Sequence, residues 1–131
     1  MKLRARALAV LSVLAISLGG VAATATPAAA VGGCPSGKLC LYEGTNYNRL
    51  AVTSTSTQAC VYLRHFGSGF GTGIASYVNN LPVNAVVYNY RGSTDTFAVA
   101  GTIRPGGFSS NSLSVNFGVS GAVCMGGVSP S

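Results

Sequence analysis

The stretch Leu39-Cys40-Leu41-Tyr42, followed by Glu43-Gly44-Thr45-Asn46-Tyr47, sets the pattern of the chain: a short apolar run and then a turn. Similar runs occur at residues 60–63, 85–88, 97–100 and 113–117, and the last alternates apolar and polar residues as a half-buried strand does. No segment has an apolar period of 3.6 residues that is long enough for a substantial helix. The pattern therefore predicts an all-β, antiparallel sandwich.

Few residues of the chain can carry acid–base chemistry. The 131 residues include 8 Lys+Arg, 2 Asp+Glu and one His, and charged residues make up 8% of the chain. Both acids, Glu43 and Asp95, fall in expected turns, so a pair of glycosidase carboxylates is not expected. The chain has His65 but no Gly-x-Ser-x-Gly elbow, which argues against a serine-hydrolase triad. The composition predicts one domain that is not an enzyme and needs no cofactor.

Residues 1–30 have the pattern of a secretory signal peptide. Basic residues at positions 2, 4 and 6 precede an uncharged apolar run over residues 7–18 and a small-residue stretch that ends at Ala28-Ala29-Ala30. The apolar run is shorter than the ~20 residues of a membrane-spanning helix. We expect cleavage after Ala30, with Ala25 as the alternative. The expected product is a secreted, extracellular protein whose single domain spans residues 31–131.

Removal of the signal lowers the positive charge. Two acids then face five dispersed cations, a net charge of +3, and these cations are Lys38, Arg49, Arg64, Arg91 and Arg104. Five scattered cations do not form the basic stripe of a nucleic-acid-binding protein. We therefore expect no nucleic-acid partner, and no membrane contact after cleavage.

All four cysteines lie within residues 31–131, which predicts two disulfides in an exported protein. A zinc site is disfavoured because the chain has one His and lacks the ligand spacing of zinc modules. Three pairings are open. We favour Cys34–Cys40, because the Pro35-Ser36-Gly37 turn lies between them, and this choice leaves Cys60–Cys124 as a long-range crosslink.

The opening Cys34-Pro-Ser-Gly-Lys-Leu-Cys-Leu-Tyr-Glu43, with Tyr47 after it, resembles peptidase inhibitor family 36. This secreted actinobacterial family is related to the streptomycete metalloproteinase inhibitor and has a βγ-crystallin-like fold. Tyr42 and Tyr47 match the aromatic pair of the crystallin folded hairpin, but Arg49 stands where a Gly usually follows. The resemblance implies two Greek-key halves packed as a disulfide-linked sandwich.

Residues 75–80 and 104–106 also resemble the family, in its Ser-rich turn and its late Pro-Gly turn. In all, the resemblance covers most of residues 34–124. It implies a monomeric, secreted peptidase inhibitor whose partner is a secreted peptidase, with a metalloendopeptidase favoured.

An inhibitor needs an extended, rigid segment that docks in the peptidase cleft like a substrate. The segment Cys60-Val61-Tyr62 fits this need. Val61 would enter the apolar pocket of a thermolysin-like enzyme, with Cys60 and Tyr62 flanking it. The simpler interpretation is an ordinary buried strand.

A second candidate is the loop that carries His65, Phe66 and Phe70 among glycines, as an exposed recognition loop. The simpler interpretation of this loop is that its two phenylalanines are core anchors.

The alternative function is a non-inhibitory, βγ-crystallin-like binding or antimicrobial module that acts through calcium or the cell wall. Calcium requires several oxygen ligands, preferably charged. At the places that match the crystallin calcium motif, residues 71–76 and 109–114, this chain has no acid. We therefore expect no metal site.

Overall fold

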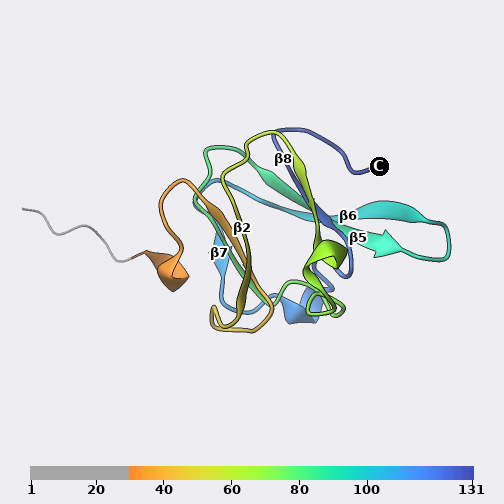
Figure 1. Cartoon of the computed structure of the whole chain (residues 1–131), viewed down its shortest axis with the longest axis horizontal. Coiled ribbons are helices and arrows are strands. Elements are labelled where there is room, and N and C mark those ends of the chain that lie inside the picture. Colours follow the sequence, from red (N-terminus) through yellow and green to blue (C-terminus); the bar gives the residue numbers. More distant parts are fainter. Residues whose placement is uncertain (1–29) are drawn as a thin grey trace, which may run out of the picture.

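The computed structural model describes residues 30–131, which form a sandwich of two four-stranded antiparallel sheets (Figure 1). The predicted signal peptide, apart from its last residue, lies outside the described residues. No helix in the described part of the chain is long and apolar enough to cross a membrane.

The strands are short. They are β1 (Leu39–Tyr42), β2 (Leu50–Ser54), β3 (Cys60–Tyr62), β4 (Ser76–Asn79), β5 (Ala85–Arg91), β6 (Thr96–Ile103), β7 (Phe108–Ser109) and β8 (Ala122–Met125). A short 3-10 turn, η3 (Val31–Gly33), precedes β1, and two more, η4 (Leu63–Phe66) and η5 (Leu113–Val115), stand between later strands.

The two sheets have the orders β2-β1-β4-β7 and β3-β8-β5-β6. Strands β1–β4 form one motif and β5–β8 a second, and each motif gives its third strand to the other sheet. The two sheets correspond strand by strand: β1, β2 and β4 of the first sheet match β5, β6 and β8 of the second, and β7 matches β3. This is the Greek-key sandwich that the sequence predicts, and the exchange places β3 at the edge of the second sheet.

The hairpin between β1 and β2 folds back on the first sheet. The hydroxyl of Ser76, which is fully buried, donates a hydrogen bond to the carbonyl of Gly44 at 2.6 Å and accepts one from the Tyr47 N–H at 3.0 Å. The rings of Tyr42 and Tyr47 pack edge to face, 5.5 Å apart. Arg49 has φ of 57°, a left-handed conformation that favours glycine, so it occupies the usual glycine position at a cost in backbone energy.

The strand predicted at residues 113–117 is wrong. This segment forms η5 and then a left-handed residue, Asn116. Its two ends are held elsewhere, because the buried Ser112 hydroxyl donates to the Ile74 carbonyl and the Ile74 N–H donates to the Phe117 carbonyl. The segment therefore pairs with no strand within residues 30–131, and Val115 stays 63% exposed.

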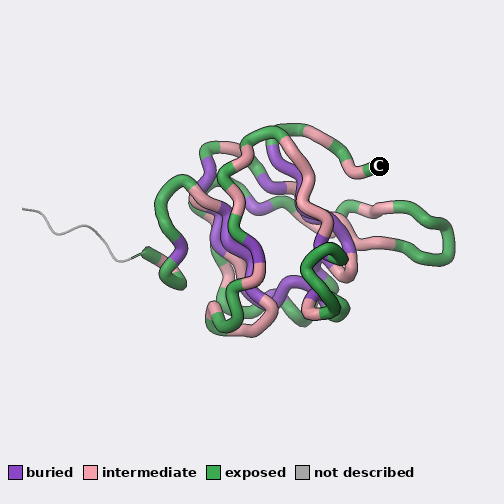
Figure 2. The backbone as a smooth tube through the Cα atoms, in the orientation of Figure 1, coloured by how far each residue is buried: buried purple, intermediate pink, exposed green. Residues whose placement is uncertain are grey.

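The main core lies between the two sheets, where the buried residues concentrate (Figure 2). Its members are Leu39, Leu41, Val52, Leu63, Phe70, Ile74, Leu81, Ala85, Val87, Ile103, Phe117, Val123 and Met125. The disulfides join Cys34 to Cys40 and Cys60 to Cys124, the pairings that the sequence analysis favours. The first lies in a separate small cluster with Tyr42, and the second crosslinks β3 to β8.

Candidate functional site

The segment Cys60-Val61-Tyr62 is an edge strand, β3, whose one neighbour in the sheet is β8. On either side of it, the Met125 N–H donates to the Ala59 carbonyl and the Leu63 N–H donates to the Gly121 carbonyl, both at 2.9 Å. Residues in an antiparallel strand alternate between hydrogen-bonded and non-hydrogen-bonded pairs. The backbone groups of Cys60 and Tyr62 therefore point away from β8, toward the open edge of the sheet.

The disulfide supports this geometry. Cys60 pairs directly with Cys124, and their Cα atoms lie 4.0 Å apart, close to the spacing of a non-hydrogen-bonded pair. The crosslink holds the edge strand on its neighbour without using the outward-facing backbone groups. The site is thus a short, extended and covalently fixed segment with a free hydrogen-bonding edge.

The side chains of β3 divide between its two faces. Val61 is half-buried and packs against the main core. Alternation along a strand then places Cys60 and Tyr62 on the outer face of the sheet. With β3 paired to β8, Val61 acts as an anchor of the strand, and Tyr62 is the outward-facing aromatic side chain.

The alternative recognition loop is only partly exposed. Phe70 is 1% exposed and belongs to the main core, so the idea that it is a recognition residue is wrong, and it is the core anchor of the simpler interpretation. Phe66 is 43% exposed on η4, and His65 is exposed beside it. The rings of His65 and Tyr62 lie 5.8 Å apart, so the structure brings this loop next to β3.

An aromatic cluster on the outer face of the second sheet is not predicted by the sequence analysis. Tyr62 packs against Phe97 with ring centroids 5.9 Å apart, and Phe97 packs against Tyr90 at 5.4 Å. The guanidinium of Arg64 lies over the Tyr90 ring, 5.9 Å from its centre. Tyr88 and Tyr90 stand two positions apart on β5, and this spacing is the sequence signal for one shared face. Phe97 joins that face because it pairs with Tyr90 across the β5–β6 hairpin.

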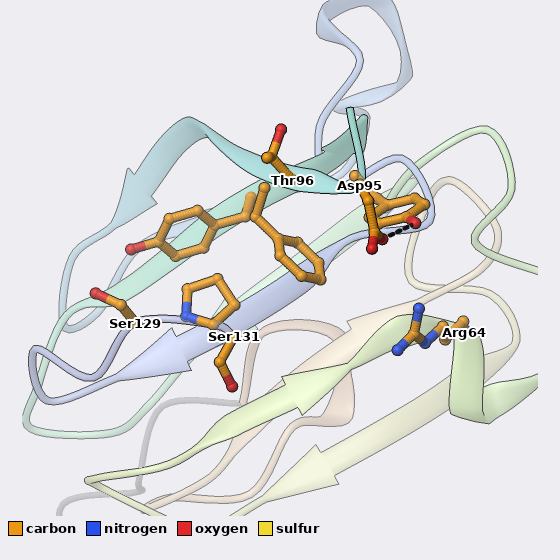
Figure 3. Close-up of a pocket in the computed structure, with 9 residues that line it drawn as sticks. Arg64, Asp95, Thr96, Ser129 and Ser131 are labelled. Carbon is orange, nitrogen blue, oxygen red and sulfur yellow. Dashed lines mark hydrogen bonds between the residues drawn. The ribbon is translucent and has the colours of Figure 1, made fainter. Parts of the chain in front are cut away.

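A hollow of about 510 Å³ opens on this face (Figure 3). Its lining comes from η4, from the β5–β6 hairpin and from the last residues of the chain, and includes Arg64, Tyr88, Asp95, Phe97 and Ser129. Hydrogen bonds with Ser131 lower the pKa of Tyr62, whereas a hydrogen bond to Asp95 raises the pKa of Tyr90.

The acids and the histidine do not form a three-residue metal-binding cluster in the described part of the chain. Within residues 30–131, the structure has no cluster of three His, Cys, Asp or Glu side chains that could hold a metal ion. Glu43 lies against Gly69, and Asp95 lies in the turn of the β5–β6 hairpin, where its carboxylate accepts a hydrogen bond from Tyr90.

Comparison with known families matches residues 27–99 to Peptidase inhibitor family I36. The matched range includes β3 and ends within β6, so η5 and β8 lie beyond it. Comparison with the curated proteins found no match, and comparison with the solved structures also found none. The match spans more than half of the chain and contains the cysteine-rich opening, the folded hairpin and the edge strand, and the chain therefore belongs to peptidase inhibitor family I36.

Proposed function

We propose that the chain is a secreted, extracellular inhibitor of metalloendopeptidases, and that β3 docks in the peptidase cleft as a substrate-like strand. Membership of an inhibitor family indicates a peptidase as the partner and a binding role rather than a catalytic one. Two disulfides fit a protein that is exported to an oxidising environment. The observation that carries the proposal is the edge strand, whose outer backbone groups have no partner among the described residues.

The mechanism is strand addition. An extended segment can pair with an exposed strand of its partner, so that main-chain hydrogen bonds supply affinity and alternate side chains supply specificity. Cys60 and Tyr62 present their N–H and carbonyl groups for such pairing. Because the strand is already extended and is fixed by the Cys60–Cys124 disulfide, little conformational entropy is lost on docking. If the peptidase cuts a peptide bond of this segment after Cys60, the same crosslink keeps the two fragments joined. The cut inhibitor then stays in the cleft, or its peptide bond forms again, and the fragments are not released.

The choice of peptidase class rests on the chemistry of the segment and on the resemblance of residues 34–47. Cys60, Val61 and Tyr62 are uncharged, so they offer nothing to the acidic pocket of a trypsin-like enzyme. An apolar segment suits thermolysin-like enzymes, which accept apolar side chains next to the scissile bond. The chain would bind its peptidase as a monomer.

The direct test is titration of the purified mature protein against a thermolysin-like peptidase, a subtilisin and a trypsin-like enzyme. We expect stoichiometric inhibition of the metalloenzyme alone. Inhibition of none of the three would refute the proposal and leave a non-inhibitory binding or antimicrobial module as the better account.

A pair of variants tests strand addition. Tyr62→Pro removes the outward-facing N–H at a position where β8 does not need it, and Tyr62→Ala removes the same side chain but keeps the N–H. We expect the proline variant to inhibit at least about tenfold more weakly than the alanine variant, the loss of about one hydrogen bond. Equal inhibition by the two variants would mean that the outer edge of β3 is not the docking surface.

A substitution at Val61 distinguishes two possible roles of its side chain, as an anchor on the core or as the group that enters the peptidase pocket. Val61→Thr keeps the shape of the side chain but adds a hydroxyl. If Val61 anchors the strand on the core, the variant loses stability and keeps its inhibition constant. If the side chain leaves the core to fill the pocket of the peptidase, the inhibition constant rises instead.

A further inference from the structure

The hollow on the outer face of the second sheet has an aromatic floor. Tyr88, Tyr90 and Phe97 contribute rings from the β5–β6 hairpin, and all three are half-buried although they lie outside the main core. Solvent-facing aromatic rings that cluster on one face mark a binding surface more often than isolated ones do. The volume of about 510 Å³ falls within the range of small-ligand sites.

Two charged side chains, Arg64 and Asp95, stand at one end of the hollow, and Ser129 stands at the other (Figure 3). One carboxylate oxygen of Asp95 accepts a hydrogen bond from Tyr90, and the other has no hydrogen-bond partner among the described residues. The Arg64 guanidinium stacks on Tyr90, and its N–H groups donate no hydrogen bond within residues 30–131. The hollow therefore has free guanidinium N–H groups on Arg64 and one free carboxylate oxygen on Asp95, and both side chains contact Tyr90.

This combination selects one class of ligand. A phosphate or an acidic peptide is disfavoured because Asp95 offsets the charge of Arg64. A purely apolar ligand would leave the free N–H groups of Arg64 and the hydroxyl of Ser129 without partners. A saccharide meets both demands, since the C–H face of its ring packs on an aromatic side chain while neighbouring hydroxyls bond to a guanidinium and a carboxylate.

We propose that the hollow between η4, the β5–β6 hairpin and residues 129–131 is a binding site for a neutral saccharide, stacked on Phe97 and hydrogen-bonded by Arg64 and Asp95. The hollow lies on the outer face of the sheet, beside the Tyr62 ring, and saccharide binding there does not require the inhibitory function.

The test titrates the mature protein with chitotetraose, cellotetraose and maltotetraose by calorimetry. Intrinsic tyrosine fluorescence gives a second signal, because the chain has no Trp. Phe97→Leu removes the ring of the floor, and Arg64→Gln removes the charge but keeps hydrogen-bonding capacity. Phe108→Leu is the matched control, since Phe108 is an exposed ring on β7 in the opposite sheet.

At least one tetrasaccharide should bind with a dissociation constant of about 1 mM or lower. Phe97→Leu and Arg64→Gln should each weaken that binding about tenfold, while Phe108→Leu leaves it unchanged and circular dichroism confirms folding of all three. Absence of binding by every tetrasaccharide would overturn the proposal, as would equal losses in the Phe97 and Phe108 variants. The peptide Val-Ser-Pro-Ser has the sequence of residues 128–131, some of which line the hollow. Binding of this peptide in place of the sugars would also overturn the proposal and assign the hollow to an extended peptide.

Discussion

Removal of each disulfide in turn tests how the sandwich is stabilised. The perturbation is a pair of double variants, Cys60→Ala with Cys124→Ala, and Cys34→Ala with Cys40→Ala. Each removes both thiols, so neither leaves a reactive cysteine behind. The two crosslinks differ chiefly in the length of chain that they close, which is 64 residues for the first and 6 for the second.

The expected losses follow from these loop lengths. In the chain-entropy description, a crosslink lowers the entropy of the unfolded chain by an amount that grows with the logarithm of the loop length. For a separation of 64 residues this gives about 4 kcal/mol at 25 °C, and for 6 residues about 2 kcal/mol. Loss of the Cys60–Cys124 crosslink should therefore cost about 2 kcal/mol more in the free energy of unfolding.

Urea unfolding followed by circular dichroism measures both losses. With an m-value of about 1.5 kcal/mol/M, the midpoint should fall by about 2.7 M without Cys60–Cys124 and by about 1.3 M without Cys34–Cys40. Inhibition provides an independent signal, because only the first crosslink fixes β3. An equal or smaller loss of stability without Cys60–Cys124 would refute the reasoning.

Three further predictions concern the folded hairpin, the buried serines and the outer tyrosine. Arg49→Gly should raise Tm, because glycine adopts the φ of 57° without a side-chain penalty of about 1 kcal/mol. Arg49→Ala is the control and should not raise Tm, since alanine keeps the Cβ atom. An unchanged Tm in the glycine variant would contradict this account. Ser76→Ala removes two hydrogen bonds and should lower the free energy of unfolding in urea by about 2 kcal/mol, and Ser112→Ala, which removes one, by about half as much; equal losses would count against this account. Tyr62 should ionise below the usual tyrosine range in an ultraviolet absorbance titration, because its pKa is lowered, so folding gains stability as the pH rises through that pKa. Tyr62→Phe should abolish the earliest ionisation step, and its persistence would show that another tyrosine titrates first.

Strands could be predicted from the sequence where an apolar run is distinct, as in β1, β3 and β5. Strand β2 shows no such run, because Val52 is its one buried residue and hydroxyl residues follow. Residues 113–117 show the opposite error, since five alternating residues match a strand although Ser112 and Phe117 hold the segment in a turn. Local alternation does not reveal the hydrogen bonds that come from residues distant in sequence.

One part of the candidate site could be identified from the sequence, and the other part depends on contacts between residues distant in the chain. The segment Cys60-Val61-Tyr62 could be identified from its cysteine and its apolar character, but the inward direction of Val61 depends on the register with β8. The hollow could not be predicted, because Arg64, Asp95 and Ser131 are far apart in the chain and the fold alone brings them together. Its single local signal is the two-residue spacing of Tyr88 and Tyr90.

The exchange of third strands makes the proposed inhibitory strand depend on both halves of the fold. Strand β3 belongs to the first motif, yet its neighbour and its disulfide partner lie on β8 of the second. Strand β8 lies beyond residue 99, where the family match ends. Residues 27–99 alone would leave Cys60 without a crosslink and β3 without a neighbour, so the rigidity on which substrate-like docking depends comes from outside the matched segment. Substitutions in β8 should therefore alter inhibition through the position of β3, without contact between β8 and the peptidase.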